Sequence, residues 1–430
     1  MNRTSTSYNN NEYESVSILK AERYLDNSLS NGDESMEVNS NNSVGATQAF
    51  LIHRHGARYP IREPSHNIAW PKERSFWRNH LGRLTPMGVI QMSRLGDFFN
   101  RRYPWLNQSN VKIYSTARSR ALESAWSFTL GLMPNSSIRF NSIKVNPCQN
   151  DSIDSSDNQN QYSNNDDSAN NDTICLINYY RSKNDLIFGQ EDSSRAYKIN
   201  INQSPLLQEY VKRDDIQRLV DRLSGNGHLR IRRDSITTIA KLKEIYSQIQ
   251  IDHQLQIPKT RSLVSHYNLT DSELELINQV GCEVMHRRLI PSTDSVNNQL
   301  YNKDQGIGLL KSIYDKLINW NKTNEFNIYS CHDTNMIALM SIFGLKIVPP
   351  DFCGYILMER MIYNGDNIIA IYYCPTPFDT SNEVAAKVWP DIDQRTDFLD
   401  WNNLSEGSFY TNDLLTLIKV SLERWSQATS

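Results

Sequence analysis

The sequence predicts an α/β fold, with a mostly parallel central sheet flanked by helices and a mainly helical domain inserted into it. Two observations support this prediction. In the earlier and later parts of the chain, short apolar runs suited to buried strands alternate with segments of helical periodicity, which is typical of α/β layers. Between about residues 205 and 320, the periodicity is helical throughout.

The first strand and helix are predicted from their local residue patterns. The apolar run 48–52 is suited to a buried strand, and the polar turn 53–60 follows it directly. Thr85 and Pro86 fit the N-cap and the first position of a helix, and apolar residues recur on one face up to residue 102. The other predicted elements are a strand at 111–114, a helix carrying Arg120, a strand at 326–330, a helix at 333–343, two strands at 355–363 and 368–373 joined by Asn364-Gly365, and a last helix from about 413.

Composition divides the chain into four parts. Residues 1–45 are rich in Asn, Ser and Glu and predict a disordered leader, because such residues bury too little apolar surface to offset the entropy of ordering. Residues 150–173 are almost entirely polar and predict a low-complexity surface loop. The segments 46–149 and 322–430 are predicted to form the α/β core, and 174–321 the mainly helical inserted domain.

Charge and hydropathy exclude several classes of partner. The net charge of -3 and the pI near 6.3 do not indicate the basic surface that nucleic-acid binding requires. No apolar run approaches the roughly 18 residues of a membrane span. The first residues lack the basic and then apolar pattern of a signal peptide, which predicts a cytoplasmic protein. Nothing in the sequence indicates an oligomeric state.

The cysteines and the glycosylation sequons carry little information. The six cysteines are widely spaced without a CxxC pair, so a zinc site formed by them is not expected. An even number permits disulfides in an oxidising compartment but does not indicate them. A chain rich in Asn and Ser also produces Asn-x-Ser/Thr triplets by chance, and they occur at Asn107, Asn135, Asn268, Asn321 and Asn403.

The densest polar cluster is the segment from Arg54 to Pro60, in which His55 stands between Arg54 and Arg58 directly after a predicted strand. Guanidinium groups present a fork of donors that matches phosphate oxygens, and Gly56 would let the backbone approach a ligand closely. These features favour a tetrahedral oxyanion as the ligand. For an Arg-His-Gly triplet alone, an ordinary solvated loop is the more frequent explanation.

Four further motifs place this cluster in a known context. The segment Arg54 to Pro60 resembles the signature RHGxRxP of the histidine acid phosphatases, the second branch of the histidine phosphatase superfamily. The resemblance covers about residues 46 to 375 and is greatest for the prostatic and lysosomal type. Inositol-polyphosphate phosphatases of this branch often carry His-Ala-Glu in place of His332-Asp333, which argues against membership in that subgroup. The other matching motifs are Leu84-Thr85-Pro86-Met87-Gly88, Ser115-Thr116-Ala117-Arg118-Ser119-Arg120, Tyr329-Ser330-Cys331-His332-Asp333-Thr334 and Val348-Pro349-Pro350.

The resemblance implies an acid phosphatase that hydrolyses a small-molecule phosphomonoester through a phosphohistidine. It implies that His55 attacks phosphorus and that Asp333 protonates the leaving alcohol and later activates water. With positive side chains around the phosphate, no metal or other cofactor is expected. The side chains implied to hold the phosphate oxygens are those of Arg54, Arg58, Arg120 and His332.

The chain departs from the family pattern in three respects. His53 stands where the family usually has an apolar residue, and Tyr114 replaces a common Arg before the Ser-Thr pair. The resemblance also implies a lysosomal or secreted protein, whereas the first residues predict a cytoplasmic one.

Two other functions remain as alternatives at this point. His53 and His55, one residue apart at a strand end, also fit paired ligands of a metal-dependent hydrolase, although Arg54 and Arg58 would repel a cation. A non-catalytic phosphate-binding protein would keep the arginines but is expected to lose His55 or Asp333. Turnover of an aryl phosphate in the presence of EDTA distinguishes these three functions.

Overall fold

The computed structural model of the 430-residue chain describes most of the segments that the sequence predicts to form helices or strands. The predicted leader at 1–45, the predicted loop at 150–173 and the Asn364-Gly365 turn lie outside the described residues. The structure describes residues 46–61, 73–134, 143–147, 175–180, 187–188, 205–225, 236–254, 262–289, 304–342, 349–363, 366–375, 377 and 408–429.

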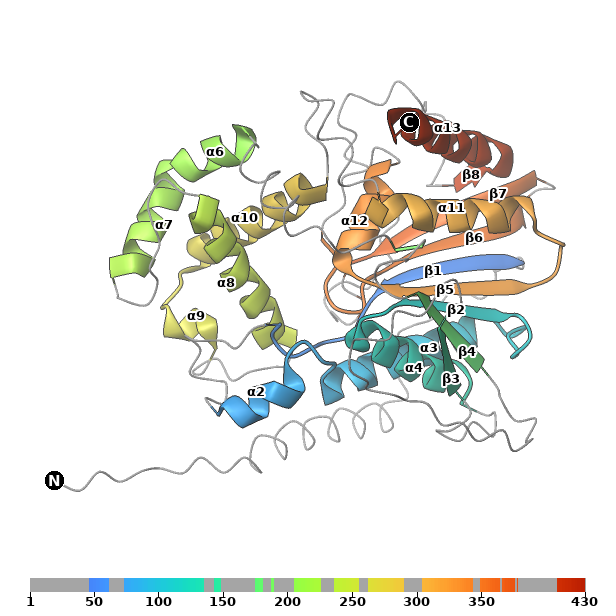
Figure 1. Cartoon of the computed structure of the whole chain (residues 1–430), viewed down its shortest axis with the longest axis horizontal. Coiled ribbons are helices and arrows are strands. Elements are labelled where there is room, and N and C mark those ends of the chain that lie inside the picture. Colours follow the sequence, from blue (N-terminus) through green and yellow to red (C-terminus); the bar gives the residue numbers. More distant parts are fainter. Residues whose placement is uncertain are drawn as a thin grey trace, which may run out of the picture.

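A mixed eight-stranded sheet forms the centre of the protein, with the strand order β3-β4-β2-β5-β1-β6-β7-β8 (Figure 1). The pairs from β3 to β1 are parallel, and those from β1 to β8 are antiparallel. The predicted α/β class is confirmed, although the parallel part makes up only four of the seven pairs. The strands are β1 Gln48–Arg54, β2 Val111–Thr116, β3 Ile143–Pro147, β4 Cys175–Tyr180, β5 Glu325–Cys331, β6 Tyr355–Tyr363, β7 Asp366–Cys374 and β8 Ser408–Tyr410.

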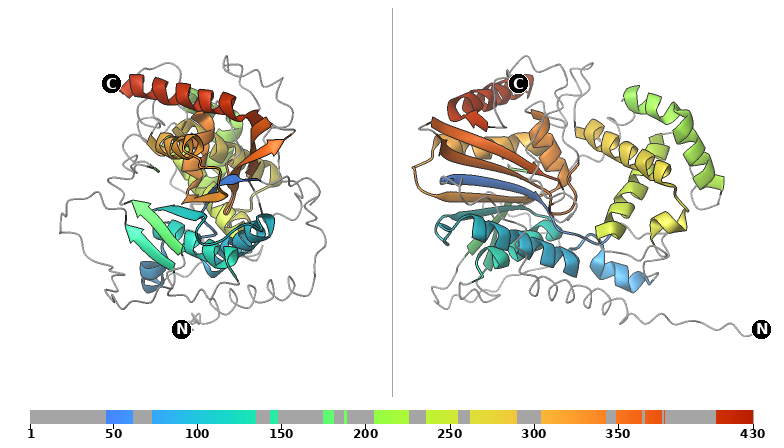
Figure 2. Two further views of the ribbon diagram at one scale, coloured as in Figure 1. Left: turned by 90° about the vertical axis from the view of Figure 1, so that its right-hand side faces the viewer. Right: turned by 180° about the vertical axis from the view of Figure 1, so that it is seen from behind.

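Helices cover both faces of the sheet, as Figure 2 shows from two further sides. Helices α3 (Pro86–Arg102) and α4 (Ser119–Leu132) pack on one face, together with the short α2 (Arg74–His80). The other face carries α11 (Asp304–Ile318), α12 (Asp333–Ile342) and α13 (Thr411–Thr429). No helix in the described part of the chain is long and apolar enough to cross a membrane.

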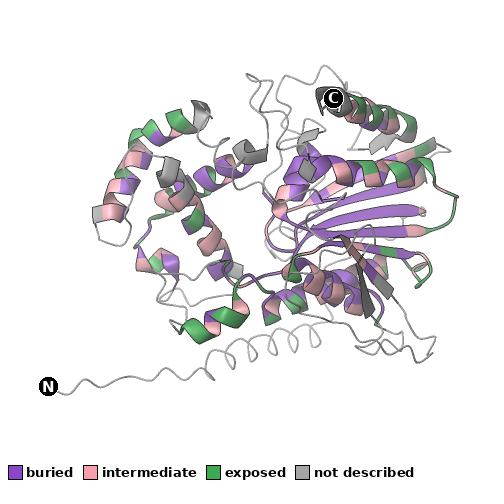
Figure 3. Ribbon diagram, in the orientation of Figure 1, coloured by how far each residue is buried: buried purple, intermediate pink, exposed green. Residues whose placement is uncertain are grey.

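Strand β1 is buried along its whole length (Figure 3). Successive side chains of a strand point to opposite faces, so Ala49 and Leu51 join the core beneath α3 and α4, while Phe50 and Ile52 join the core beneath α11 and α12. A strand that is apolar on both faces must lie in the middle of the sheet. The end of β1 is therefore held between both helical layers.

The long helix α3 begins and ends as its sequence predicts. The Thr85 hydroxyl accepts a hydrogen bond from the Gly88 backbone N–H at 3.1 Å, and Pro86 occupies the first helical position. The buried face includes Met92, Leu95 and Phe99.

Helices α6 to α10 form a second helical unit with a core of its own, beside the sheet (Figure 1). The predicted inserted range 174–321 also contains β4 and α11, but β4 pairs within the main sheet and α11 packs against it. Their sequences alone do not separate them from the neighbouring helical unit. The helices of this unit are α6 Pro205–Lys212, α7 Asp214–Gly225, α8 Ile236–Gln254, α9 Leu263–His266 and α10 Asp271–Leu289.

Candidate active site

The predicted site residues meet at the carboxyl ends of the parallel strands. Arg54 of β1 lies opposite Cys331 of β5, so His55 and His332 leave the sheet as neighbours. Strand β2 runs parallel to β5 on its other side, and the chain after it enters α4, which carries Arg120 in its first turn. Carboxyl ends of parallel strands are where open α/β sheets bind ligands.

The His55 side chain is held in one orientation. Its backbone N–H donates to the Cys331 carbonyl at 3.1 Å, and its ring Nδ1 lies 2.9 Å from the Gly56 carbonyl. A carbonyl only accepts hydrogen bonds, so Nδ1 must carry the proton, which leaves the lone pair on Nε2. The edge of the His332 ring approaches at 5.3 Å between centroids. His55 Nε2 is thus suited to act as a nucleophile.

The surroundings of His55 keep its imidazole neutral. Burial, and next the charges of Arg120, His332, Arg54 and Arg58, lower the pKa of His55 well below 6.5. The side chain is only 3% exposed. Its lone pair therefore remains available at acidic pH, where an ordinary histidine is protonated.

The three arginines carry more donors than their protein partners use. Arg54 donates to the Pro350 carbonyl at 2.7 Å and Arg58 to the Tyr59 carbonyl at 3.0 Å. Burial and then neighbouring arginines lower the pKa of Arg58 to about 9 and that of Arg120 to about 10. Buried donors without partners are costly, so this cluster is suited to an anion. Among the described residues, hydrogen-bond partners are lacking for the Nε atoms of Arg54, Arg58 and Arg120 and for Nδ1 of His332.

Asp333 is the first residue of α12 and forms an ion pair with Arg54 at 3.1 Å. Its Oδ1 accepts from the Thr334 backbone N–H at 2.8 Å. Burial opposes its ionisation, but Arg54, then Lys243 of α8 and other cations outweigh that effect and hold the pKa of Asp333 below its usual range. The carboxyl is therefore ionised while no ligand competes for Arg54.

Lys243 contributes to the electrostatics of the site, and no sequence pattern reveals this role. It lies on α8, within the helical unit, yet its charge acts on Asp333. No motif surrounds it, and only the packing of α8 near the strand ends brings the two together.

Phe352 forms an aromatic wall shared by three site residues, and no sequence pattern points to it. The guanidinium carbons of Arg54 and Arg58 lie 4.4 and 5.8 Å from its ring centroid, and the His55 ring centroid lies 5.6 Å away. An aromatic face attracts cations without using their N–H donors. Phe352 thus supports both guanidiniums without occupying any of their N–H donors.

Phe352→Leu should weaken inhibition by vanadate roughly three- to tenfold. The substitution removes the cation–π contacts of the ring with Arg54 and Arg58, which position these side chains for the anion. The inhibition constant for turnover of an aryl phosphate measures this. The matched control is Phe99→Leu, which truncates an equally buried aromatic ring of the same core away from the arginines. It should lower stability and leave vanadate inhibition unchanged; equal weakening in both variants would contradict a positioning role for Phe352.

The loop after β1 is fixed by the N-terminal turn of α3. A Cβ atom on Gly56 would lie 2.5 Å from the Gly88 carbonyl oxygen, and one on Gly88 would lie 2.1 Å from the Ala57 carbonyl oxygen. The sequence predicts that Gly56 lets the backbone approach a ligand. The structure shows a different reason for a glycine at this position, namely that the backbones of Gly56 and Gly88 lie in direct contact. Ser124 and Gln91 accept hydrogen bonds from the Gly56 and Ala57 backbone N–H groups at 3.0 and 3.1 Å.

His53 belongs to the core and not to the site. It is fully buried, and its ring stacks on Phe128 of α4 at 5.5 Å. Burial lowers its pKa to about 4, so it is neutral. His55 instead contacts His332 and Phe352. These separate surroundings do not support His53 and His55 as paired metal ligands.

Comparison with known proteins identifies the family. A model of the histidine phosphatase superfamily (branch 2) matches residues 47–369. The chain belongs to this family. The match contains every predicted site residue of the histidine phosphatase, from Arg54 to Asp333, and the strands β1 to β6.

Curated relatives of this histidine phosphatase match over shorter segments. The chain is 36% identical over 89 residues to testicular acid phosphatase of Mus musculus and 37% identical over 93 residues to testicular acid phosphatase of Homo sapiens. Each alignment covers 20% of this chain and 21% of the relative, so the matched segment spans about a fifth of those proteins.

Solved structures share the fold of this histidine phosphatase. Hafnia alvei phytase in complex with tartrate has a TM-score of 0.57 and 14% identity, with 88% of this chain and 98% of that chain covered. The phytase of Citrobacter braakii has a TM-score of 0.56 and 13% identity, with 87% and 98% covered. At this level of identity the likeness establishes the fold alone.

Proposed function

We propose that this histidine phosphatase is an acid phosphatase that hydrolyses phosphomonoesters through a phosphohistidine on His55. The observation that carries the proposal is the orientation of His55: Nδ1 is bound to the Gly56 carbonyl, so the neutral Nε2 lies among unpartnered cationic donors. Phosphoryl transfer requires mainly positioning and compensation of negative charge. The testicular acid phosphatases among its relatives bear names consistent with this reaction.

In the first step, His55 Nε2 forms a bond to phosphorus while the bond from phosphorus to the ester oxygen breaks. The guanidiniums of Arg54, Arg58 and Arg120 and the His332 ring compensate the charge on the other phosphate oxygens. Asp333 gives its proton to the departing oxygen, which leaves as an alcohol. In the second step, the Asp333 carboxylate takes a proton from water, the resulting hydroxide oxygen bonds to phosphorus, and the bond to Nε2 breaks.

Substrate binding itself prepares Asp333 for the first step. In the resting site Arg54 holds the carboxyl ionised. Phosphate oxygens that bind Arg54 weaken this ion pair, and their negative charge raises the pKa of the nearby carboxyl. The bound ester therefore favours the protonated form of Asp333, which is the form that can act as an acid.

Rapid quenching tests the proposal. Brief reaction with a radiolabelled phosphomonoester, followed by quenching in alkali, should leave phosphate bound to the protein in an acid-labile form, as expected of an N–P bond. His55→Ala should lose this label and the activity together. His53→Ala is the matched control, because it removes a neighbouring imidazole that faces the core. Label retained without His55 would overturn the assignment.

A further inference from the structure

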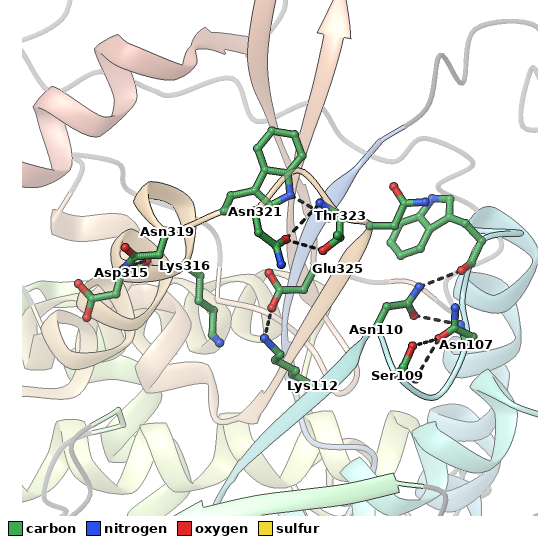
Figure 4. Close-up of a pocket in the computed structure, with 13 residues that line it drawn as sticks. Asn107, Ser109, Asn110, Lys112, Asp315, Lys316, Asn319, Asn321, Thr323 and Glu325 are labelled. Atoms are coloured by element: carbon green, nitrogen blue, oxygen red, sulfur yellow. Dashed lines mark hydrogen bonds and ion pairs between the residues drawn. The ribbon is translucent and has the colours of Figure 1, made fainter.

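A second pocket lies at the other end of the sheet from the candidate active site. It has a volume of about 730 Å³ and is formed where β2 and β5 begin, beside the end of α11 (Figure 4). Strand β5 spans the seven residues from Glu325 to Cys331, which separates the two sites by about 20 Å at 3.3 Å per residue. The pocket is therefore not an extension of the active site.

The lining combines two indole rings with many side-chain amides and has no net charge. Two lysines, Lys112 and Lys316, are balanced by two acids, Asp315 and Glu325. Amides both donate and accept hydrogen bonds without charge. The indole rings are those of Trp105 and Trp320, and the amides include those of Asn110, Asn319 and Asn324.

The lysines of this pocket are already engaged. Lys112 forms an ion pair with Glu325, which also accepts from Gln48 at 3.1 Å. Lys316 donates to the Tyr114 hydroxyl at 3.0 Å and lies 5.0 Å from the centre of that ring. The active site differs in having buried cationic donors without partners. This second pocket is thus poorly suited to phosphate and better suited to a neutral ligand.

Trp320 is a fixed aromatic platform. Its Nε1–H donates to the Thr323 carbonyl at 2.8 Å, and the guanidinium of Arg360 lies 4.4 Å from the ring centroid. Arg360 is itself buried and donates to the Leu317 carbonyl at 3.1 Å. The indole is consequently held in place before any ligand arrives, which lowers the entropic cost of binding.

We propose that this pocket binds a neutral saccharide. One face of a sugar ring presents C–H groups that pack on an aromatic ring such as Trp320 or Trp105, and its edge presents hydroxyls that exchange hydrogen bonds with amides. Rigid aromatic surfaces with a few orienting polar groups are typical of small-molecule sites of this size. The proposal does not depend on the reaction proposed for His55.

Two sources could supply the saccharide. The pocket contains two sequons, Asn107-Gln108-Ser109 and Asn321-Lys322-Thr323. In each, the hydroxyl donates to the side-chain oxygen of the Asn, as drawn in Figure 4. The ligand is therefore either a separate saccharide or a glycan attached to the chain itself at the rim, and the experiment distinguishes these sources.

Calorimetric titration of the full chain, made in bacteria without N-glycans, tests the proposal with N,N′-diacetylchitobiose and mannobiose as probes. The wild type should bind at least one of them. Trp320→Ala should bind about tenfold more weakly or worse, while Trp320→Phe, which keeps a platform, should bind within about threefold of wild type. Asn324→Ala, at an exposed residue, should also weaken binding.

The matched control is Trp126→Phe, which changes an indole on α4 outside the pocket and should leave saccharide binding unchanged. All four variants should retain inhibition of turnover by inorganic phosphate, which reports an intact fold and active site. Absence of binding of both probes by the wild type at about 10 mM would overturn the proposal. Equal affinities of wild type, Trp320→Ala and Asn324→Ala would overturn it too.

The same titration on protein made in a eukaryotic secretory host identifies the source. If glycan is present at Asn107 or Asn321 and probe binding returns only after deglycosylation, the ligand is the chain's own glycan. If the glycosylated protein binds the probes directly, the ligand is a separate saccharide.

Discussion

Asp333→Asn should lower the rate of hydrolysis of alkyl phosphates by about 10² to 10⁴, because an amide cannot protonate the departing oxygen. The need for an acid grows with the basicity of that oxygen. An aryl phosphate with a good leaving group should therefore lose much less in its phosphorylation step. The variant keeps an oxygen that can accept from the Thr334 backbone N–H, so the start of α12 is preserved.

The kinetics of Asp333→Asn also separate the two roles of this residue. If Asp333 activates water, dephosphorylation becomes limiting, and a burst of nitrophenol precedes slow phosphate release. Asp271→Asn is the matched control, since Asp271 is the first residue of α10 as Asp333 is of α12. Asp271→Asn should leave the rates of hydrolysis of alkyl and aryl phosphates unchanged. Equal, small losses for alkyl and aryl phosphates without a burst would show that Asp333 only supports the helix.

Arg54→Ala should reduce kcat/KM by roughly tenfold to more than a hundredfold, because a charge-assisted contact to phosphate contributes about 1.5–3 kcal/mol. Vanadate inhibition should weaken with it. Arg101→Ala is the matched control, since Arg101 is exposed and pairs with Asp97 in the last part of α3. It should leave kcat/KM within about twofold of wild type.

The pH profile of Arg54→Ala provides a second and more specific measurement. Besides burial, Arg54 is one of the charges that lower the pKa of His55, and among the charges around Asp333 it is the strongest that lowers the pKa of that carboxyl. Its loss raises both pKa values. His55 then becomes protonated, and inactive, at a higher pH, while Asp333 stays protonated to a higher pH. Both limbs of the kcat/KM profile should thus move to higher pH; an unchanged profile would contradict this electrostatic role.

Elements with local sequence signals could be predicted, whereas elements that depend on pairing between distant segments could not. The helix at 86–102 was predicted to the residue, because Thr85 and Pro86 are local signals and the apolar face repeats regularly. Thr270 and Glu273 stand three residues apart in the sequence, a spacing that predicts a capping box, and their reciprocal hydrogen bonds confirm it. By contrast, the predicted boundaries place β4 in the mainly helical part of the chain, because no local pattern reveals its pairing with β2 and β3.

The chemical groups of the candidate site, and the order in which they follow the strands, can be recognised from the sequence alone. Arg54, His55 and Arg58 stand in one short motif, and His332 and Asp333 stand in another at a second strand end. Motifs of this kind are local, so they can be recognised before the fold is known.

The orientation and the charge state of these groups depend on tertiary contacts. The Gly56 carbonyl determines which ring nitrogen of His55 carries the proton, and Phe352 supports two guanidiniums. Burial and the surrounding cations together determine the pKa values of His55 and Asp333. The saccharide pocket likewise exists only where the start of β2 meets the end of α11. These properties arise from contacts between segments distant in sequence and from exclusion of water, neither of which a local pattern encodes.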